Sequence, residues 1–355
     1  MIKYTIRRCI LAIPVLILIT ILLFFMMRAQ GNPADRFAQN AKVTTAQIAA
    51  FEHRWGLDKA LPEQYCDWLG VCGDKPPIIN ALPAVLGGGD NGILHGDLGY
   101  STFDGVPVSD VIAQRALPTV ILMGTAYIIW LTLAILLGVY AAVKRYSLFD
   151  SGLTIFNYVG YSLPTFWLGL MLITFLAVPP LRWFPASGMN DAYTTPGFGT
   201  DAYWAFVASN PFFALFDLGR HLVLPVITLV LVSIAGDSRF VRSSMLDALN
   251  QDYVKTARAK GVPERRVILH HALRNALLPV ITNIGLELPI LFSGAIVTEQ
   301  IFGWPGMGRQ LLDSLGHADY PVMMGILLIT SVFVVVANLL ADIMYAVVDP
   351  RVKYD

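Results

Sequence analysis

Six long apolar runs constrain the fold of this chain more than any other feature. They cover residues 9–27, 117–143, 152–178, 222–240, 276–298 and 322–348. A hydrocarbon core of about 30 Å is crossed by about 20 helical residues, a length that these runs approach or exceed. With 55% hydrophobic and only 14% charged residues, the chain is too apolar for a water-soluble core to bury. The sequence therefore predicts an all-α polytopic membrane protein with six transmembrane helices.

The distribution of Lys and Arg predicts that the N-terminus and the C-terminus both lie in the cytoplasm. If the chain crosses six times from an inner N-terminus, 15 of its 25 basic residues fall on the inner side, within about 60 residues, as the positive-inside rule favours. Because the net charge is zero, this asymmetry is the main electrostatic signal, and no nucleic acid partner is expected. The inner set comprises Lys3, Arg7, Arg8, Lys144, Arg145, Arg239, Arg242, Lys255, Arg258, Lys260, Arg265, Arg266, Arg274, Arg351 and Lys353.

These spans divide the chain into three regions. Residues 1–28 hold the N-terminal segment and the first span, which is interpreted as retained because no small-residue cleavage site follows Met27. Residues 29–116 form a large first extracytoplasmic segment. Residues 117–355 form a core that contains the other five spans and a basic inner loop at 243–275.

The first outer segment is predicted to contain two short helices. Thr44 or Thr45 can cap a helix with an apolar face that ends at Gly56, and a second helix covers residues 62–69. Cys66 and Cys72 also lie in this segment. An oxidising compartment would let them form a small disulfide-closed loop, and the alternatives are two separate thiols or metal ligands without visible partners.

The inner loop is predicted to fold as two helices joined by an elbow. A helix from Ser243 to Lys260 should end at Gly261, because glycine readily adopts the left-handed backbone at a helix end. Pro263 suits the first turn of a second helix, and Glu264 favours its positive end. An elbow that projects from the membrane in this way can transmit force.

The loop offers small residues for close approach and positive charge for a partner or for lipid headgroups. An ordinary positive-inside connector would explain the Lys and Arg residues but not the Ala-x-Ala-x-Gly-x-Pro run that starts at Ala257. The residues predicted to bind a partner are Tyr253, Thr256, Ala257, Arg258, Ala259, Lys260, Gly261, Pro263, Arg265 and Arg266.

At these residues the chain resembles the permease subunits of ABC-type importers, in the branch that handles peptides and nickel. The loop motif of that family is Glu-Ala-Ala, three residues, Gly, and later a Leu-Pro pair. Here Lys255, Thr256 and Ala257 fill its first three positions, Gly261 fills the glycine, and Leu278–Pro279 closes the motif. The missing Glu and the longer spacing depart from the general pattern, whereas the sequence TARAKG resembles the peptide and nickel branch.

The resemblance extends over nearly the whole chain. It leaves out two apparent insertions, at about residues 70–92 and 189–218, both predicted to lie outside. The matching segments are GNPADRF at Gly31, WGLDKALPEQYCDWL at Trp55, HGDLGYS at His95, YSLPTFWLGLMLI at Tyr161, WFPASG at Trp183, EQIFGWPGMG at Glu299, DYPVMMG at Asp319 and NLLADIMYAVVDPR at Asn338.

The resemblance implies a division of labour among several subunits in a bacterial or archaeal inner membrane. This chain would form half of a translocation path with a second homologous permease, two ATP-binding cassette subunits would bind the inner loops, and an extracytoplasmic binding protein would deliver the solute. No phosphate-binding Gly-x-x-x-x-Gly-Lys-Ser/Thr motif occurs in the sequence. ATP and Mg are therefore expected on the partner subunits, and this chain is expected to be neither an enzyme nor a cofactor-binding protein.

The solute stays open among di- or oligopeptides, nickel or another chelated metal, glutathione-like compounds and oligosaccharides. Whether the two permeases are identical is also open. The alternative mechanism is an ion-gradient-driven secondary transporter that uses intramembrane carboxylates. Such a transporter needs no inner docking elbow.

Four of the polar residues within the predicted spans are candidates for function or for buried pairing. Glu287 and Asn338 are candidates to line the translocation path, and Glu287 lies near Pro289 about half-way along the fifth span. Asp237 and Asp342 lie nearer the inner ends, where Arg239, Arg242 or Arg351 could pair with them. Three aromatic residues, Trp183, Trp204 and Trp304, are expected to anchor the outer membrane interface.

Overall fold

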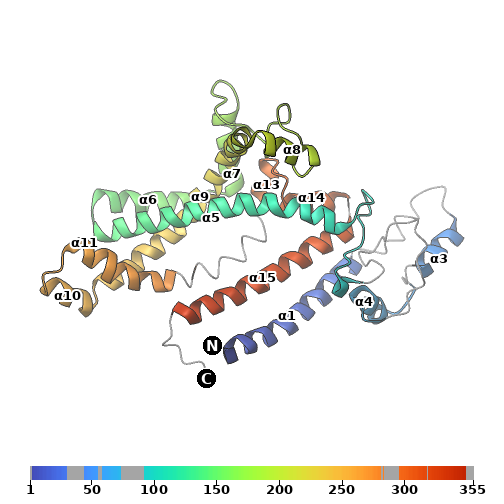
Figure 1. The fold of residues 1–355 in the computed structure, drawn as a ribbon, viewed down its shortest axis with the longest axis horizontal. Coiled ribbons are helices and arrows are strands. Elements are labelled where there is room, and N and C mark those ends of the chain that lie inside the picture. Colours follow the sequence, from blue (N-terminus) through green and yellow to red (C-terminus); the bar gives the residue numbers. More distant parts are fainter. Residues whose placement is uncertain are drawn as a thin grey trace. The chain divides into compact units, whose positions relative to one another are not determined.

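The computed structural model describes residues 2–29, 44–54, 58–72, 92–280, 283, 296–317 and 319–348. These residues form helices and connecting loops, with one isolated β-bridge between Tyr100 and Pro107 and no strand among them. The all-α prediction agrees with this described part of the chain (Figure 1).

The described helices and helical turns follow one another along the chain. In order they are α1 (Ile2–Ala29), α3 (Thr45–Arg54), α4 (Leu61–Leu69), the 3-10 turn η1 (Ile93–His95), α5 (Val108–Val143), α6 (Leu148–Ser162), α7 (Thr165–Leu172), the π-helical turn η2 (Ile173–Ala177), α8 (Asp201–Ser209), α9 (Pro211–Leu249), α10 (Asp252–Ala259), α11 (Glu264–Arg266), the π-helical turn η3 (Val267–Ala272), α13 (Ile296–Ile301), α14 (Met307–His317) and α15 (Tyr320–Val348). Residues 273–280 continue η3 as a helix.

Four described helices are long and apolar enough to cross a membrane: Ile6–Ala29 of α1, then α5, α9, and Tyr320–Leu340 of α15. A fifth crossing arises if α6 and the α7–η2 segment form one span, which is bent by 101°. The bend follows from Pro164, which lacks a backbone N–H and forces the preceding Leu163 into extended backbone. The fifth predicted run, 276–298, lies largely outside the described residues. Six spans with both termini inside therefore stay a prediction.

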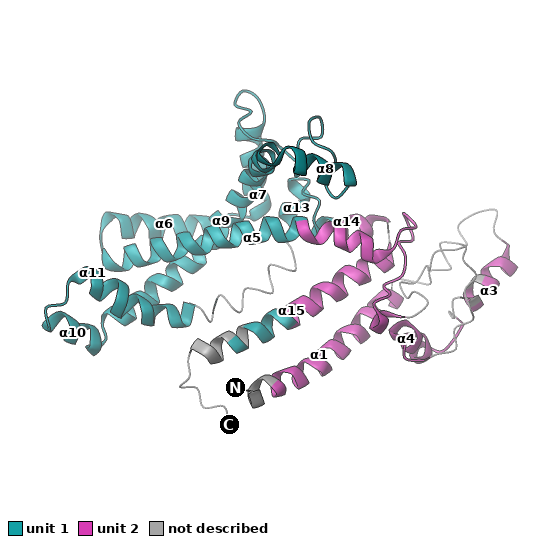
Figure 2. Ribbon diagram, viewed as in Figure 1, with its two compact units in different colours: residues 1–5, 118–309, 336–355 teal, residues 6–117, 310–335 magenta. Residues whose placement is uncertain are grey.

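The chain divides into two compact units (Figure 2). Unit 1 comprises residues 1–5, 118–309 and 336–355, and unit 2 comprises residues 6–117 and 310–335. The region boundaries predicted from the sequence near residues 28 and 116 stay predictions.

The core of unit 1 is the packing of α5 against α9. Gly138 of α5 makes this contact close, because a Cβ on it would lie 2.7 Å from the carbonyl oxygen of Ser238 in α9. Successive turns of α5 contribute large apolar side chains to the same contact with α9. The cluster contains Leu122, Met123, Ala126, Tyr127 and Trp130 from α5, Val226, Leu229 and Val230 from α9, Met189 from the loop after η2 and Trp304 from the loop after α13.

Within unit 2, the outer segment is packed onto the membrane-length helices. Trp68 of α4 is buried against Phe24 and Met27 of α1 and Met324 of α15. The hydroxyls of Thr20 and Tyr65 lie 2.8 Å apart and link α1 to α4 by a hydrogen bond. The outer segment therefore belongs to the same core as part of the membrane helices.

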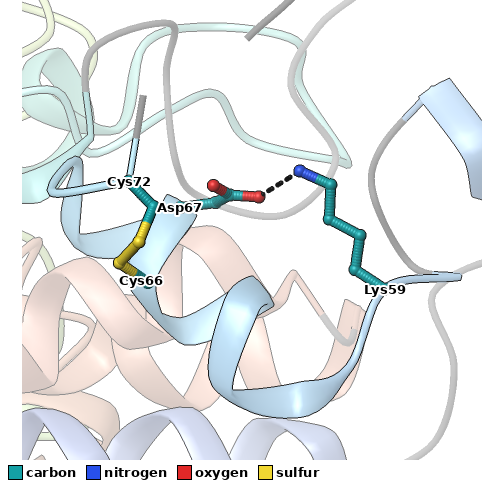
Figure 3. The surroundings of a disulfide bond; sticks show 4 residues. All are labelled: Lys59, Cys66, Asp67 and Cys72. Carbon is teal, nitrogen blue, oxygen red and sulfur yellow. Dashed lines mark hydrogen bonds and ion pairs between the residues drawn. A yellow bond between two sulfur atoms is a disulfide. The ribbon is translucent and has the colours of Figure 1, made fainter. Parts of the chain in front are cut away.

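The end of α4 is closed by a disulfide between Cys66 and Cys72, whose Cα atoms are 5.3 Å apart (Figure 3). Of the interpretations that the sequence leaves open for these two cysteines, the structure shows the disulfide. Gly70 ends the helix in the left-handed conformation, with φ of 80°. On the other side of α4, Lys59 Nζ donates to Asp67 Oδ2 at 2.7 Å.

Helix α3 shows the predicted start. Gln47 N donates to Thr44 Oγ1 at 3.4 Å, and Thr44 N donates to Gln47 Oε1 at 2.8 Å, which is the reciprocal pattern of a capping box. The predicted end at Gly56 lies outside the described residues.

Candidate functional site

The inner loop begins with a break that the sequence did not reveal. The prediction of one helix from Ser243 to Lys260 is wrong, because α9 ends at Leu249 and α10 begins at Asp252. Between them Gln251 adopts extended backbone, with φ of −71° and ψ of 151°. Asp252 then lies in the first turn of α10, where a carboxylate is favoured by the helix dipole. The break therefore places Asp252 at the start of a new helix.

The elbow itself forms at Gly261, as predicted. Its φ of 73° places it in the left-handed region. Gly261 N donates to Arg258 O at 3.0 Å and Val262 N donates to Ala257 O at 3.2 Å, which is the hydrogen-bond pattern of a Schellman motif. Pro263 precedes the next helix, which begins at Glu264, so the proline lies one residue earlier than expected.

One face of the elbow is apolar and packs onto unit 1. Val254, Ala257 and Val267 are buried there against the end of α9 and the end of α5. Ala257 is thus the one member of the predicted partner-binding set that faces the core. The complete cluster is Ala142, Met245, Ala248, Val254, Ala257, Val267, Ala272 and Ala276.

The opposite face of the elbow is exposed and basic. Arg258 Nη2 donates to Glu264 Oε1 at 2.6 Å, so an ion pair joins the two arms of the elbow. This bond to Arg258 holds the pKa of the Glu264 carboxyl below its usual value. Among the described residues, Lys260, Arg265 and Arg266 have no ion-pair partner. The remaining exposed members of the predicted set are Tyr253, Thr256, Ala259, Gly261 and Pro263.

The predicted intramembrane residues have different outcomes. Glu287 lies outside the described residues, and so does the side chain of Asp342. Asn338 is exposed on α15, and its role in a translocation path stays a prediction.

Of the arginines that the sequence offered as possible partners of Asp237, Arg242 binds a different carboxylate. Asp237 Oδ2 accepts a hydrogen bond from Trp130 Nε1 at 2.9 Å, and Oδ1 accepts one from Asn283 Nδ2 at 3.5 Å. Arg242 instead binds Asp150. The two residues are five apart on one helix, so they project in different directions around the α9 axis.

The three tryptophans expected at the outer interface separate into two groups. Trp183 and Trp204 are exposed, as interface anchors would be. Trp304 is fully buried, and its Nε1 donates to Pro118 O at 2.8 Å. The prediction for Trp304 is wrong because the segment after α13 folds back onto α5.

The same segment contains a buried carboxyl, Glu299, which is not among the predicted site residues. Glu299 of α13 accepts hydrogen bonds from Thr119 Oγ1 at 2.8 Å and from Arg309 N at 3.0 Å. Burial raises the pKa of this carboxyl. A Cβ on Gly306 would overlap the carboxyl group. The closely spaced glycines after Trp304, Gly306 and Gly308, are the sequence feature that could have indicated this close packing around Glu299.

Taken together, the apolar helices define a multi-pass membrane protein with an exposed basic inner loop. Comparison with known sequences defines its family. The family model described as "Binding-protein-dependent transport system inner membrane component" matches residues 134–354, and the model for the N-terminal part of such membrane components matches residues 1–123. The chain belongs to this family of ABC transporter permease subunits.

Several characterised members are similar over their full length. The oligopeptide transport system permease protein AppB of Bacillus subtilis (strain 168) is 40% identical over 355 residues, covering 100% of both chains. The dipeptide transport system permease protein DppB of Escherichia coli (strain K12) is 37% identical over 366 residues, covering 100% of this chain and 99% of its own. The di/tripeptide transport system permease protein DppB of Pseudomonas aeruginosa (strain UCBPP-PA14) is 36% identical over 359 residues, with the same coverage.

Proposed function

We propose that this chain is the permease subunit of an importer for di- or oligopeptides in the bacterial inner membrane. The observation that carries the proposal is the end-to-end similarity to relatives named as oligopeptide, dipeptide and di/tripeptide permeases. In this role the chain crosses the membrane six times and forms half of the translocation path with a second homologous permease. A binding protein outside the membrane delivers the peptide.

The elbow around Gly261 is the proposed contact with the ATPase subunits, which hold ATP and Mg. Its geometry supports this role in two ways. The exposed cations Lys260, Arg265 and Arg266 provide charge for a partner. The buried side, through Val254 and Val267, is packed against α9 and α5, so a displacement of the elbow is transmitted to two membrane-length helices.

In the proposed cycle, closure of the ATPases on ATP moves the elbow, and the elbow moves the helices that it packs against. The path then opens toward the outside and accepts the peptide. Hydrolysis of ATP resets the inward-facing state. In this cycle the chain itself performs no chemistry and acts as the mechanical part of the transporter.

Reconstituted vesicles test the proposal. We expect vesicles that contain this chain, its partner permease, the ATPases and the binding protein to accumulate labelled di- and tripeptides with ATP, and to accumulate none when this chain is left out or ADP replaces ATP. Accumulation driven by a proton or sodium gradient without ATP would contradict the proposal and favour a secondary transporter. ATP-driven uptake of nickel with no uptake of peptide would retain the machinery but reject the peptide as its cargo.

A further inference from the structure

A charged pair joins α6 to α9 near the inner loop. Arg242 Nε donates to Asp150 Oδ1 at 2.6 Å, and Arg242 Nη2 donates to Asp150 Oδ2 at 2.8 Å. Asp150 is buried, whereas 27% of the Arg242 side chain is exposed. A two-pronged arginine–carboxylate contact of this kind fixes the relative orientation of the groups as well as their distance.

Asp150 also organises the turn that leads into α6. Its Oδ2 accepts a hydrogen bond from Tyr146 N at 2.9 Å, where the backbone is left-handed with φ of 63°. Asp150 N in turn donates to Ser147 Oγ at 3.2 Å, so Ser147 caps α6. One carboxylate therefore ties the α5–α6 turn, the first turn of α6 and α9 together.

Two further contacts continue the seam along α6. Asn157 Nδ2 donates to Ser238 Oγ at 2.9 Å in a buried position. At Gly160, a Cβ would lie 3.2 Å from the carbonyl oxygen of Leu231 in α9, which shows a close helix contact. Asp150, Asn157 and Gly160 are spaced by seven and three residues, so they share one face of α6.

The charged pair lies close to the elbow along α9. Arg242 precedes the end of α9 at Leu249 by seven residues, or about 10 Å at 1.5 Å per residue. In that interval Met245 and Ala248 pack against Val254 of the elbow. Helix α9 thus contacts the elbow with its last turns and α6 with the turns just before.

We propose that Asp150 and Arg242 are positioning residues that make α6 move with α9 and the elbow. This inference rests on the proposed function and adds a route to it. Displacement of the elbow passes through α9 and the Asp150–Arg242 pair to α6, and from there to the bent α6–α7 segment. Without the pair, the elbow still moves α9, but α6 no longer moves together with α9.

Replacing Asp150 with asparagine tests the pair with the smallest change in shape. In vesicles with all partners, we expect Asp150→Asn to lower the peptide taken up per ATP hydrolysed by about tenfold, within the range of about 5- to 150-fold that coupling between sites typically produces. Assembly and ATP hydrolysis should stay close to wild type. Asp67→Asn is the matched control, because it removes an ion pair of similar length in the outer segment, and its uptake per ATP should be unchanged.

A covalent link between the same helices distinguishes positioning from a general loss of stability. Asn157→Cys and Ser238→Cys place two thiols on side chains that touch, in a chain that also carries Cys9→Ser. Joining them with a short thiol cross-linker should leave transport intact when Asp150 is present, because the helices move as one body. It should also restore uptake per ATP in Asp150→Asn.

Three results would overturn the inference. They are wild-type uptake per ATP in Asp150→Asn, loss of transport on cross-linking when Asp150 is present, and failure of the cross-link to restore Asp150→Asn. All are ratios to wild-type vesicles. If the wild-type vesicles themselves accumulate no peptide with ATP, the proposed function fails, and the two failures remain distinguishable.

Discussion

Replacing Gly261 with valine is expected to lower ATP-driven uptake about tenfold while leaving the chain inserted in the membrane. The residue has a φ of 73°, and a Cβ there meets no described atom within 4 Å, so the cost comes from the backbone conformation and not from a clash. Left-handed backbone costs an ordinary residue about 1–2 kcal/mol, and about 1.4 kcal/mol corresponds to a factor of ten in an equilibrium. Valine, with a branched Cβ, should therefore open the turn and redirect the arm that begins at Glu264.

Asparagine at the same position provides the matched control. It is larger and more polar than glycine but tolerates the left-handed conformation, so Gly261→Asn should keep most of the uptake. Both variants are measured as peptide uptake and ATP hydrolysis in the same vesicle preparation, with membrane insertion checked by protease protection. Equal uptake by Gly261→Val and the wild type would contradict the elbow as the coupling element.

Replacing Gly138 with alanine is expected to destabilise unit 1 by about 1–3 kcal/mol, the usual cost of overpacking a tight contact. A Cβ on Gly138 would lie 2.7 Å from Ser238 O and 2.8 Å from Val241 Cβ. Because these atoms belong to the backbone and to a branched side chain of α9, neither can rotate away, and the two helices must separate. The measurement is the thermal midpoint of the chain in detergent, together with uptake in vesicles.

Gly124 lies on the same helix and provides the comparison. Within the described part of the chain, a Cβ there meets no atom within 4 Å, and alanine favours a helix by about 1 kcal/mol over glycine. Gly124→Ala should therefore unfold at the same temperature as the wild type or higher. A Gly138→Ala variant as stable as Gly124→Ala would show that α5 and α9 do not pack as closely as the structure indicates.

The long apolar helices were the most predictable part of the fold, because each reports its own length and polarity within one stretch of sequence. The turn at Gly261 was equally local, since a glycine after a helical pattern and a proline two residues later define it. The break between α9 and α10 was missed because Asn250 and Gln251 are compatible with a continuous helix. Tertiary packing of Val254 and Ala257 onto α9 favours the broken form.

The contacts that join distant segments could not be predicted from one sequence. Asp150 and Arg242 are 92 residues apart, and Thr119 and Glu299 are 180 residues apart. No local pattern reports such a pairing. Charge alone suggested a nearer partner for Arg242 in Asp237, and hydropathy alone suggested an interfacial Trp304. The packing of α6 against α9 instead places Arg242 beside Asp150, and the packing of the segment after α13 onto α5 buries Trp304.

Site-specific photo-cross-linking tests whether the basic elbow binds the ATPase subunits. A photoreactive residue at Arg265, which is exposed on the elbow, is compared in the assembled transporter with one at Tyr193, which is 99% exposed in the predicted outer insertion. We expect a covalent adduct with an ATPase subunit from position 265 and none from position 193. A transporter that takes up peptide normally but forms no ATPase adduct at position 265, or forms one at position 193, would contradict this binding.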